Sequence, residues 1–248
     1  MCVCVCVYVM SVIMCMSAAV VVWLSTPSHH PLTPSLRAHP QAILGGDLAR
    51  HNAHDHCKLL PENTYGYTKA TCELMTNEYT RRGFIDGRGM RLPSIVVRPG
   101  LPNAAATSCF SGVVREPLSG HDAVLPLPLD LEHPAASYQV AVEGMVGLME
   151  MEAGKLDVDR VYNLPSINIT LQSLIDAARR FADLHPGEVG ELGNWVEERD
   201  DNLTAIVQSM PCVTNGDRAM QLGIRQDKSV DDLVAAYARD MIGICGSE

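Results

Sequence analysis

From Gln41 onward, short apolar runs alternate with longer segments of helical periodicity, and this alternation restricts the fold more than any other feature. Residues 94–97 form an apolar, mostly β-branched run, which is typical of a parallel strand covered on both faces. Residues 42–44 and 161–164 are shorter strand candidates. Strands that alternate with helices predict an α/β fold, with a parallel sheet and a helical C-terminal portion.

One long helix is predicted from about Tyr65 to Arg82. Asn63 or Thr64 precedes it and is suited to cap its first amides. At the other end, Gly83 follows two arginines, and cations followed by glycine are typical of a helix C-terminus. The segment therefore has both a start and a stop signal.

Two further helices are predicted towards the C-terminus. In the first, apolar residues recur at helical spacing; they are Leu171, Leu174, Ile175, Ala178 and Phe181. In the second, Ser229 and Asp232 resemble a capping box ahead of Leu233, Ala236 and Tyr237.

The first 40 residues differ from the rest. Residues 1–24 carry no charge and are long enough to span a bilayer, but no basic segment precedes them. The strict Cys/Val alternation of residues 2–7 is what a repeated TG dinucleotide encodes. Residues 25–40, rich in Pro, Ser and His, are predicted to be a linker. We interpret residues 1–40 as non-native coding sequence outside the fold, with a membrane anchor and a signal peptide as alternatives, and residues 41–248 as the folded part.

Charge and cysteine usage exclude several classes of protein. A formal net charge of −10 provides no electrostatic footprint for nucleic acid or anionic lipid. Nine cysteines without CxxC pairing indicate neither a disulfide framework nor a zinc ribbon, so we expect a cytoplasmic protein, or one anchored through residues 1–24. One loop gathers His51, His54, His56 and Cys57, but no second ligand group stands at a recognisable spacing, so no metal site is predicted.

Tyr65 and Lys69 stand four residues apart at the start of the long helix, so their side chains should share one helical face. An ammonium beside a phenol favours the phenolate and lowers the phenol's pKa. The tyrosine could then move a proton on or off a substrate hydroxyl. The spacing alone is also met by an ordinary exposed pair on a helix.

The surrounding residues make the pair more specific. The pattern from Pro61 through Tyr65-Gly66, Thr68-Lys69-Ala70 and Glu73 resembles the active-site helix of the extended short-chain dehydrogenase/reductase (NAD-dependent epimerase/dehydratase) family. Further motifs follow in order and resemble the D-erythronate dehydrogenase branch; they are Gly83-Phe84, Asp86-Gly87, residues 91–100, residues 102–106 and residues 115–118.

This resemblance implies a Rossmann-type fold, NAD as cofactor, and oxidation of a CH–OH group on a sugar acid or similar small polyol. Position by position it implies the following roles: Tyr65 as catalytic acid/base, Lys69 as the group that lowers its pKa and bonds the nicotinamide ribose, Pro99 and Gly100 as the lining of the nicotinamide pocket, and Asn103 and Arg115 as substrate contacts. A guanidinium suits a carboxylate because it offers paired donors.

Two parts of the family pattern are missing. No glycine-rich turn that would hold a pyrophosphate occurs in the chain. The catalytic serine should stand 24 or 25 residues before the tyrosine, where Pro40 and Gln41 are found. We therefore expect an incomplete Rossmann-type sheet and a chain that is inactive as it stands, and we expect the exposed sheet edge to promote aggregation. The alternative functions are a nucleotide-sugar epimerase/dehydratase and a non-catalytic remnant that binds a partner. The expected partner is a small-molecule substrate, and a homo-oligomer is possible.

Overall fold

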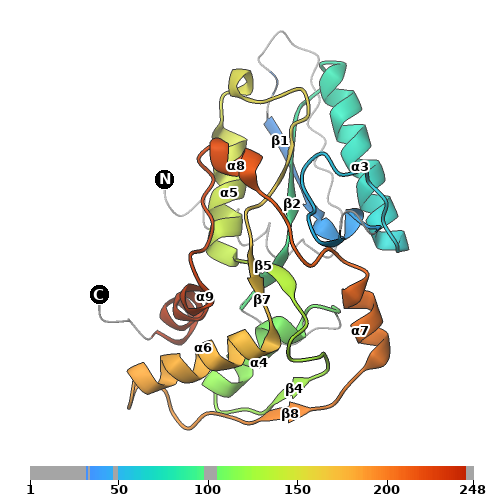
Figure 1. Cartoon of the computed structure of the whole chain (residues 1–248). Helices are drawn as coiled ribbons and strands as arrows, with labels where there is room; N and C mark the ends of the chain where they lie inside the picture. Colours follow the sequence, from blue (N-terminus) through green and yellow to red (C-terminus); the bar gives the residue numbers. More distant parts are fainter. Residues whose placement is uncertain (1–31, 33, 47–49, 98–104, 244–248) are drawn as a thin grey trace.

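Parallel strands organise the part of the chain that the computed structural model describes, which is residue 32 and residues 34–46, 50–97 and 105–243. In one sheet, β1 (Pro34–Pro40) pairs along its whole length with β2 (Asp86–Leu92), and β2 pairs with β6 (Val161–Asn163), all in parallel (Figure 1). The α/β fold with a parallel sheet, predicted from the alternation of elements, is confirmed.

Two smaller strand groups continue the architecture. β3 (Ser94–Val96) lies parallel to β5 (His133–Ser137), while β7 (Ile167–Ile169) meets the other edge of β5 in the antiparallel direction. β4 (Ala123–Leu125) and β8 (Trp195–Glu197) form a parallel pair. The predicted strands at residues 94–97 and 161–164 are confirmed to within one residue.

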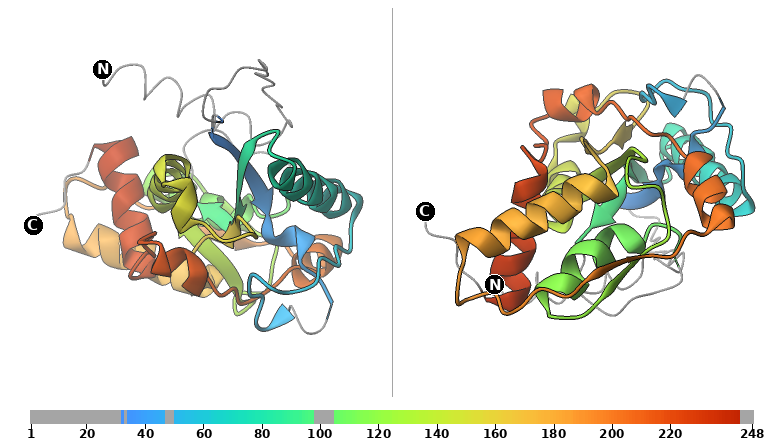
Figure 2. Two further views of the ribbon diagram at one scale, coloured as in Figure 1. Left: turned by 90° about the horizontal axis from the view of Figure 1, so that it is seen from above. Right: turned by 60° about the horizontal axis from the view of Figure 1, so that its bottom comes forward.

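Two helices cover opposite faces of the strands β1 and β2 (Figures 1 and 2). They are α3 (Thr64–Arg81) and α5 (Tyr138–Glu150). Side chains alternate along β1, so Leu36 and Ala38 pack into the core that α5 lines, whereas Arg37 and His39 belong to the other face. The face that points towards α3 therefore carries polar residues.

A second core lies where the C-terminal helices meet β3 and β5 (Figure 1). Its helices are α4 (Cys109–Leu118), α6 (Leu171–Leu184) and α9 (Val230–Tyr237). The shorter helices α7 (Asp201–Gln208) and η4 (Ala238–Ile242) contribute to the same core. α8 (Asp217–Gln221) packs instead on β6, and η3 (Ala153–Lys155) follows the end of α5. The helical C-terminal portion expected from the sequence is present.

Side-chain caps fix where the helices begin. Asn63 accepts a hydrogen bond from the amide of Gly66 at 2.8 Å and so starts α3. Thr170 starts α6 through a reciprocal capping box with Ser173. Ser229 accepts from the amide of Asp232 at the start of α9, as the sequence indicated.

The central strand β2 is buried at every position although two arginines lie within it. Arg88 forms an ion pair with Asp86 and donates to backbone carbonyls at the C-terminal end of α5, including that of Leu148 at 2.6 Å. A Cβ added to Gly89 would come within 2.9 Å of the Val161 side chain, so the glycine allows β6 to approach.

Two expectations for the start of the fold are wrong. Residues 42–44 are not a strand, because Gln41–Ile43 form the 3-10 helix η2 and Leu44 makes an isolated bridge with Leu59. The linker predicted for residues 25–40 is instead the strand β1 over Pro34–Pro40. Its two prolines stand at its ends, where a missing amide costs no ladder hydrogen bond, and only every second residue is apolar.

Candidate active site

The start of α3 holds the tyrosine–lysine pair, Tyr65 and Lys69, which we call the dyad. Gly66 allows the close packing there, because an added Cβ would lie 2.5 Å from the carbonyl oxygen of Ala42 and 2.7 Å from Cβ of Pro61. Tyr65 and Lys69 share one helical face, as predicted, and Nζ of Lys69 lies 5.5 Å from the centroid of the Tyr65 ring. This distance is within cation–π range.

The electrostatics of the pair differ from the expectation. Burial raises the pKa of the Tyr65 phenol, although the side chain is 51% exposed. Lys69 was expected to lower that pKa, but in this structure its ammonium lies against the ring face, which attracts it. Burial is the cause of the shift, and it favours the protonated phenol.

Beside this pair, the carboxyl end of β1 places two polar side chains under α3. His39 and Gln41 are only 2% and 4% exposed, and neither the ring nitrogens nor the amide atoms have a hydrogen-bond partner among the described residues. The pKa of His39 is lowered to about 4, first by burial and next by the charge of Arg91, and both the backbone and the ammonium of Lys69 act on it as well. His39 is therefore a neutral imidazole close to Lys69.

Neither residue at the two positions that the family resemblance assigns to the catalytic serine has a side-chain hydroxyl. Pro40 is the last residue of β1 and Gln41 opens η2. Both stand at the carboxyl end of a parallel strand, which is where α/β folds bind ligands.

A buried ion pair fixes α3 against the sheet. Arg91 on β2 donates to both carboxylate oxygens of Glu73, at 3.0 and 2.5 Å, and each side chain is 3% exposed. Its remaining terminal nitrogen donates to the carbonyl oxygen of Asp55 at 2.9 Å. One guanidinium thus links the dyad helix, the central strand and the preceding loop.

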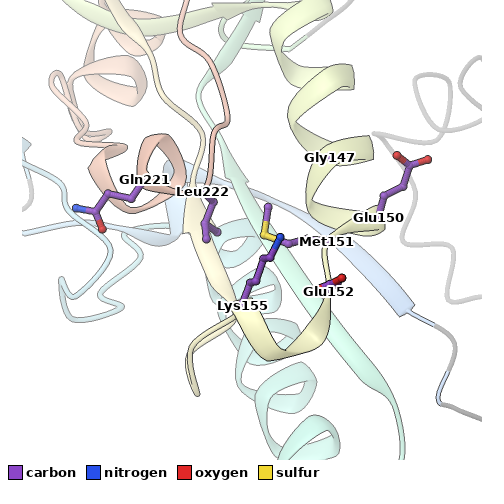
Figure 3. A pocket seen from close by; sticks show the side chains of 7 residues that line it. All are labelled: Gly147, Glu150, Met151, Glu152, Lys155, Gln221 and Leu222. Carbon is purple, nitrogen blue, oxygen red and sulfur yellow. The ribbon is translucent and has the colours of Figure 1, made fainter.

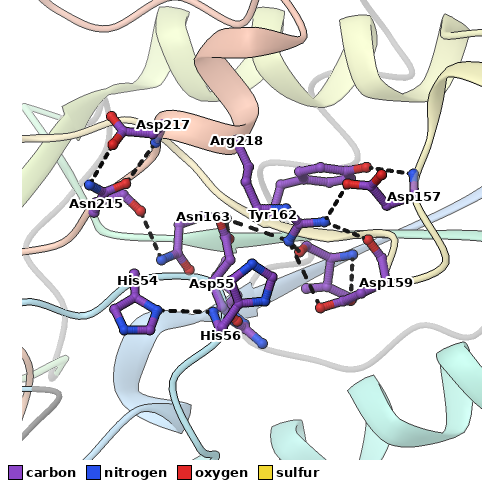
Figure 4. Close-up of polar contacts among 12 residues, drawn as sticks. His54, Asp55, His56, Asp157, Asp159, Tyr162, Asn163, Asn215, Asp217 and Arg218 are labelled. Atoms are coloured by element: carbon purple, nitrogen blue, oxygen red, sulfur yellow. Dashed lines mark hydrogen bonds and ion pairs between the residues drawn. The ribbon is translucent and has the colours of Figure 1, made fainter.

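Asp55 is the centre of a second polar network (Figure 4). Its carboxylate accepts a 2.5 Å hydrogen bond from the amide of Asn163, and burial raises its pKa. Arg218, on α8, lies 3.9 Å from the same carboxylate and stacks on Tyr162, with its guanidinium carbon 4.4 Å from the ring centroid. This network joins the loop before α3 to β6 and α8.

The histidines of the same loop do not form a metal site in the region that the structure covers, where three or more ligating side chains nowhere gather. His54 accepts from the backbone amide of His56 at 3.2 Å (Figure 4). His51 lies 3.3 Å from the thiol of Cys212. These contacts hold the loop in place.

The other predicted site residues divide into two groups. Pro99, Gly100 and Asn103 lie outside the described residues. Arg115 lies on α4, which packs against α6 and β4, and its guanidinium forms a 2.5 Å ion pair with Glu116. α4 lies beside α6, apart from α3 (Figure 1).

An open depression lies at the C-terminal end of α5 (Figure 3), which is at the opposite end of the central strands from the dyad. It is lined by Gly147, Glu150, Met151, Glu152, Lys155, Gln221 and Leu222. Arg88, in the amino-terminal half of β2, binds the carbonyl of Met151 at its rim. The depression thus lies at the amino end of the parallel strands, so we do not assign the chemistry to it.

The residues near the dyad fit one end of a dinucleotide. Lys69 can donate to a ribose, and the unpartnered Gln41 amide lies at the same end of β1. No glycine-rich turn of the kind that cradles a diphosphate leads from a strand into a helix within the described residues. At the start of α5, Asp227 instead accepts from the amide of Ser137. The described residues therefore fit a nicotinamide ribose and do not fit a diphosphate.

Comparison with known proteins agrees with this geometry. No family model matches the chain. Over 199 residues the chain is 40% identical to D-erythronate dehydrogenase of Cupriavidus necator, covering 80% of this chain and 60% of that protein. D-erythronate dehydrogenase of Haemophilus influenzae is 32% identical over 197 residues, covering 79% and 60%. The matched residues belong to the extended short-chain dehydrogenase/reductase family.

Solved structures lead to the same fold. The nucleoside-diphosphate-sugar epimerase of Agrobacterium tumefaciens has a TM-score of 0.76 at 31% identity, covering 85% of this chain and 60% of that chain. The holo form of a GalE-like L-threonine dehydrogenase from Cupriavidus necator has a TM-score of 0.73 at 20% identity, which shows the fold alone. The chain spans 60% of the length of the curated relatives it matches.

Sequence reasoning missed His39 and the Asp55–Arg218 network. His39 stands in a stretch whose composition indicated a linker, so only the alternation of Leu36 and Ala38 with polar residues could have revealed it. Among the described residues, no helix combines the length and the apolarity that crossing a bilayer requires. The apolar residues 1–24 lie outside that part of the chain.

Proposed function

We propose that this chain is the catalytic part of an NAD-dependent oxidoreductase that acts on a CH–OH group of a sugar acid such as D-erythronate. The observation that carries the proposal is the Tyr65–Lys69 pair, placed on one face of α3 in a chain that is 40% identical to a D-erythronate dehydrogenase. NAD, when bound, supplies the hydride acceptor.

In this proposal Tyr65 exchanges the proton of the substrate hydroxyl. For substrate oxidation the phenolate must be accessible near neutral pH, whereas burial raises the pKa of the phenol. Lys69 would reverse this when its flexible stem brings the ammonium from the ring face to the hydroxyl. Asn103 and Arg115 are proposed substrate contacts, and Pro99 and Gly100 the proposed lining of the nicotinamide pocket.

The first test uses the chain itself. We expect it to bind NAD too weakly to turn over D-erythronate, because it has no glycine-rich turn for the diphosphate and no serine beside the tyrosine. Calorimetric titration that gives micromolar NAD binding would contradict this expectation.

The second test supplies the missing part. In a chimera, the portion of the Cupriavidus enzyme that this chain does not match precedes Ala42, so that both Pro40 and Gln41 are replaced. The chimera should form NADH from D-erythronate, followed by absorbance. Tyr65→Phe should lower kcat by about 10²–10⁴-fold, the usual range for a general acid/base. Tyr67→Phe is the matched control because Tyr67 lies on the same helix and is 60% exposed. An unchanged kcat in the Tyr65 variant would refute the proposal.

A nucleotide-sugar epimerase is the alternative enzyme, favoured by the 31% identity to the Agrobacterium epimerase. Chromatography of the chimera with UDP-glucose distinguishes the two, because an epimerase changes the sugar without net formation of NADH. A non-catalytic remnant is the alternative outside enzymes, and a chimera that folds without either activity would support it.

We further propose that the chain forms a homo-oligomer through the outer face of α3. That face exposes Tyr67, Leu74 and Met75, at 60%, 61% and 49%. Apolar groups that gather on one helix face are typical of an interface. Light scattering should give a mass above one chain, and Leu74→Glu should lower it; a monomer at all concentrations would contradict the proposal.

A further inference from the structure

Residues on the polar face of β1 and on the adjoining turn of α3 form an unneutralised cationic site. Arg37 and His39 are two residues apart on β1 and therefore share a face. Gln41 is the first residue after the strand. Leu36 and Ala38, which alternate with Arg37 and His39 along β1, pack towards α5, so the polar face is the one beneath α3. The charges of Arg37 and Lys69 both act on the His39 ring, which places all three groups together.

These side chains have no partners that explain their burial. Nε of Arg37, both ring nitrogens of His39 and both amide atoms of Gln41 are buried without a hydrogen bond of standard geometry in the described part of the molecule, although the backbone of Lys69 lies close to the His39 ring. His39 and Gln41 are each more than nine-tenths buried. Buried polar atoms in native proteins are nearly always satisfied, so these five atoms, on one face of β1 and in the adjoining η2, indicate a bound ligand. Nε of Arg37, one ring nitrogen of neutral His39 and the amide nitrogen of Gln41 are donors, and an oxyanion can satisfy donors.

The charges specify the sign of that ligand. Three cations surround His39, and one of them, Arg91, is neutralised by Glu73. Neither Arg37 nor Lys69 forms an ion pair with any carboxylate that the structure describes. In a protein with a formal net charge of −10, two cations without acidic partners at one site will draw an anion.

We propose that Arg37, His39, Gln41 and Lys69 form a binding site for a small oxyanion, a carboxylate or a phosphate. The guanidinium and the ammonium supply charge, while the imidazole and the carboxamide donate hydrogen bonds to the anion oxygens. The site lies at the carboxyl end of β1, next to Tyr65, so a carboxylate held there would bring the carbon chain of a sugar acid to the phenol. The site itself is independent of the proposed hydride transfer, and failure of that reaction leaves it intact.

The test is calorimetric titration of the full chain with three probes. Inorganic phosphate and D-erythronate are the two anions, and erythritol is the neutral polyol that lacks the carboxylate. We expect saturable binding of at least one anion and none of erythritol. Binding of D-erythronate assigns the site to a carboxylate, and binding of phosphate alone assigns it to a phosphate. Equal binding of erythritol and D-erythronate, or no binding of either anion, overturns the proposal.

Variants locate the site. Arg37→Gln should weaken anion binding at least about tenfold, as loss of a charge-assisted contact does. Arg50→Gln is the matched control, because Arg50 is exposed and joins its surroundings through its backbone carbonyl. Equal affinities in the two variants overturn the proposal.

A measurement on the unaltered chain covers the case in which Arg37→Gln fails to fold. The imidazole NMR signal of His39, assigned through His39→Asn, should move saturably when the bound anion is added. A signal that stays in place during saturation overturns the proposal.

Discussion

Removing Glu73 should destabilise the fold far more than removing an exposed carboxylate. The Glu73–Arg91 pair is 3% exposed on both sides and links α3 to β2. Glu73→Ala leaves a buried guanidinium with two donors unpaired, while the hydrogen bond to the Asp55 carbonyl keeps that guanidinium in place. Breaking one side of a buried ion pair costs about 3–5 kcal/mol.

That loss is a large share of the stability of an ordinary domain, about 5–15 kcal/mol. With a urea m-value of about 2 kcal/mol/M, a loss of about 4 kcal/mol lowers the unfolding midpoint by about 2 M. Circular dichroism of the full chain during urea titration measures this midpoint. Glu143→Ala is the control: Glu143 pairs with Arg225 at the surface, each 56% exposed, and its removal should cost about 0.2–1 kcal/mol.

A double variant separates the charge from the packing. Glu73→Leu with Arg91→Met replaces both charges by apolar groups, so it should recover most of the loss seen in Glu73→Ala. The reasoning is refuted if Glu73→Ala unfolds within about 1 kcal/mol of the parent chain. It is also refuted if the double variant is less stable than the single one.

Three further predictions concern single positions. Gly66→Ala should lower the free energy of unfolding by about 1–3 kcal/mol, because the new Cβ would lie 2.5 Å from a backbone oxygen. Gly147→Ala is the control, because a Cβ there meets nothing within 4 Å. Thermal melts of the two variants measure the difference, and equal melting temperatures would contradict the prediction. The pKa values of His39 and His133 are lowered to about 4, so both imidazoles are neutral in the fold above that pH. The fold should therefore keep its full stability above pH 6.5 and lose up to about 3 kcal/mol per histidine as the pH falls towards 4. Imidazole NMR midpoints near 6.5 would contradict this. Burial raises the pKa of Tyr65, so its phenol should ionise above pH 10, and its contribution to stability should be lost as the pH rises through that pKa. Phenolate absorbance during a pH titration measures the ionisation. A phenolate signal that appears below pH 10 and is absent from Tyr65→Phe would contradict the prediction.

The helices were predictable because their signals are local. Asn63, Gly83 and Ser229 act on amides or on backbone conformation within a few residues, and all three stand where the sequence placed them. The shared face of Tyr65 and Lys69 follows from helical spacing alone.

The strands β1 and β2 were not predictable in the same way. β2 reads Asp-Gly-Arg-Gly-Met-Arg-Leu, and its arginines are tolerated in the interior because of their partners. Glu73 on α3 neutralises Arg91, whereas Arg88 pairs with Asp86 in the same strand and donates to distant carbonyls of α5. The pKa of Tyr65 also depends on where the Lys69 ammonium lies, which spacing does not determine. Side-chain positions that residue spacing does not determine decide both cases.

The loop before the dyad helix is completed by a segment more than 150 residues later in the chain. The amide of Cys212 donates to the carbonyl of Arg50 at 2.8 Å, and the amide of Asn215 donates to Ala53 at 2.9 Å. During synthesis, which proceeds from the N-terminus, Arg91 and Asn163 can contact this loop at Asp55 well before Cys212 and Asn215 have been made. The tyrosine helix can form early, but the last hydrogen bonds to its preceding loop form late, so a ribosome that stalls before residue 212 releases a loop that is held only in part.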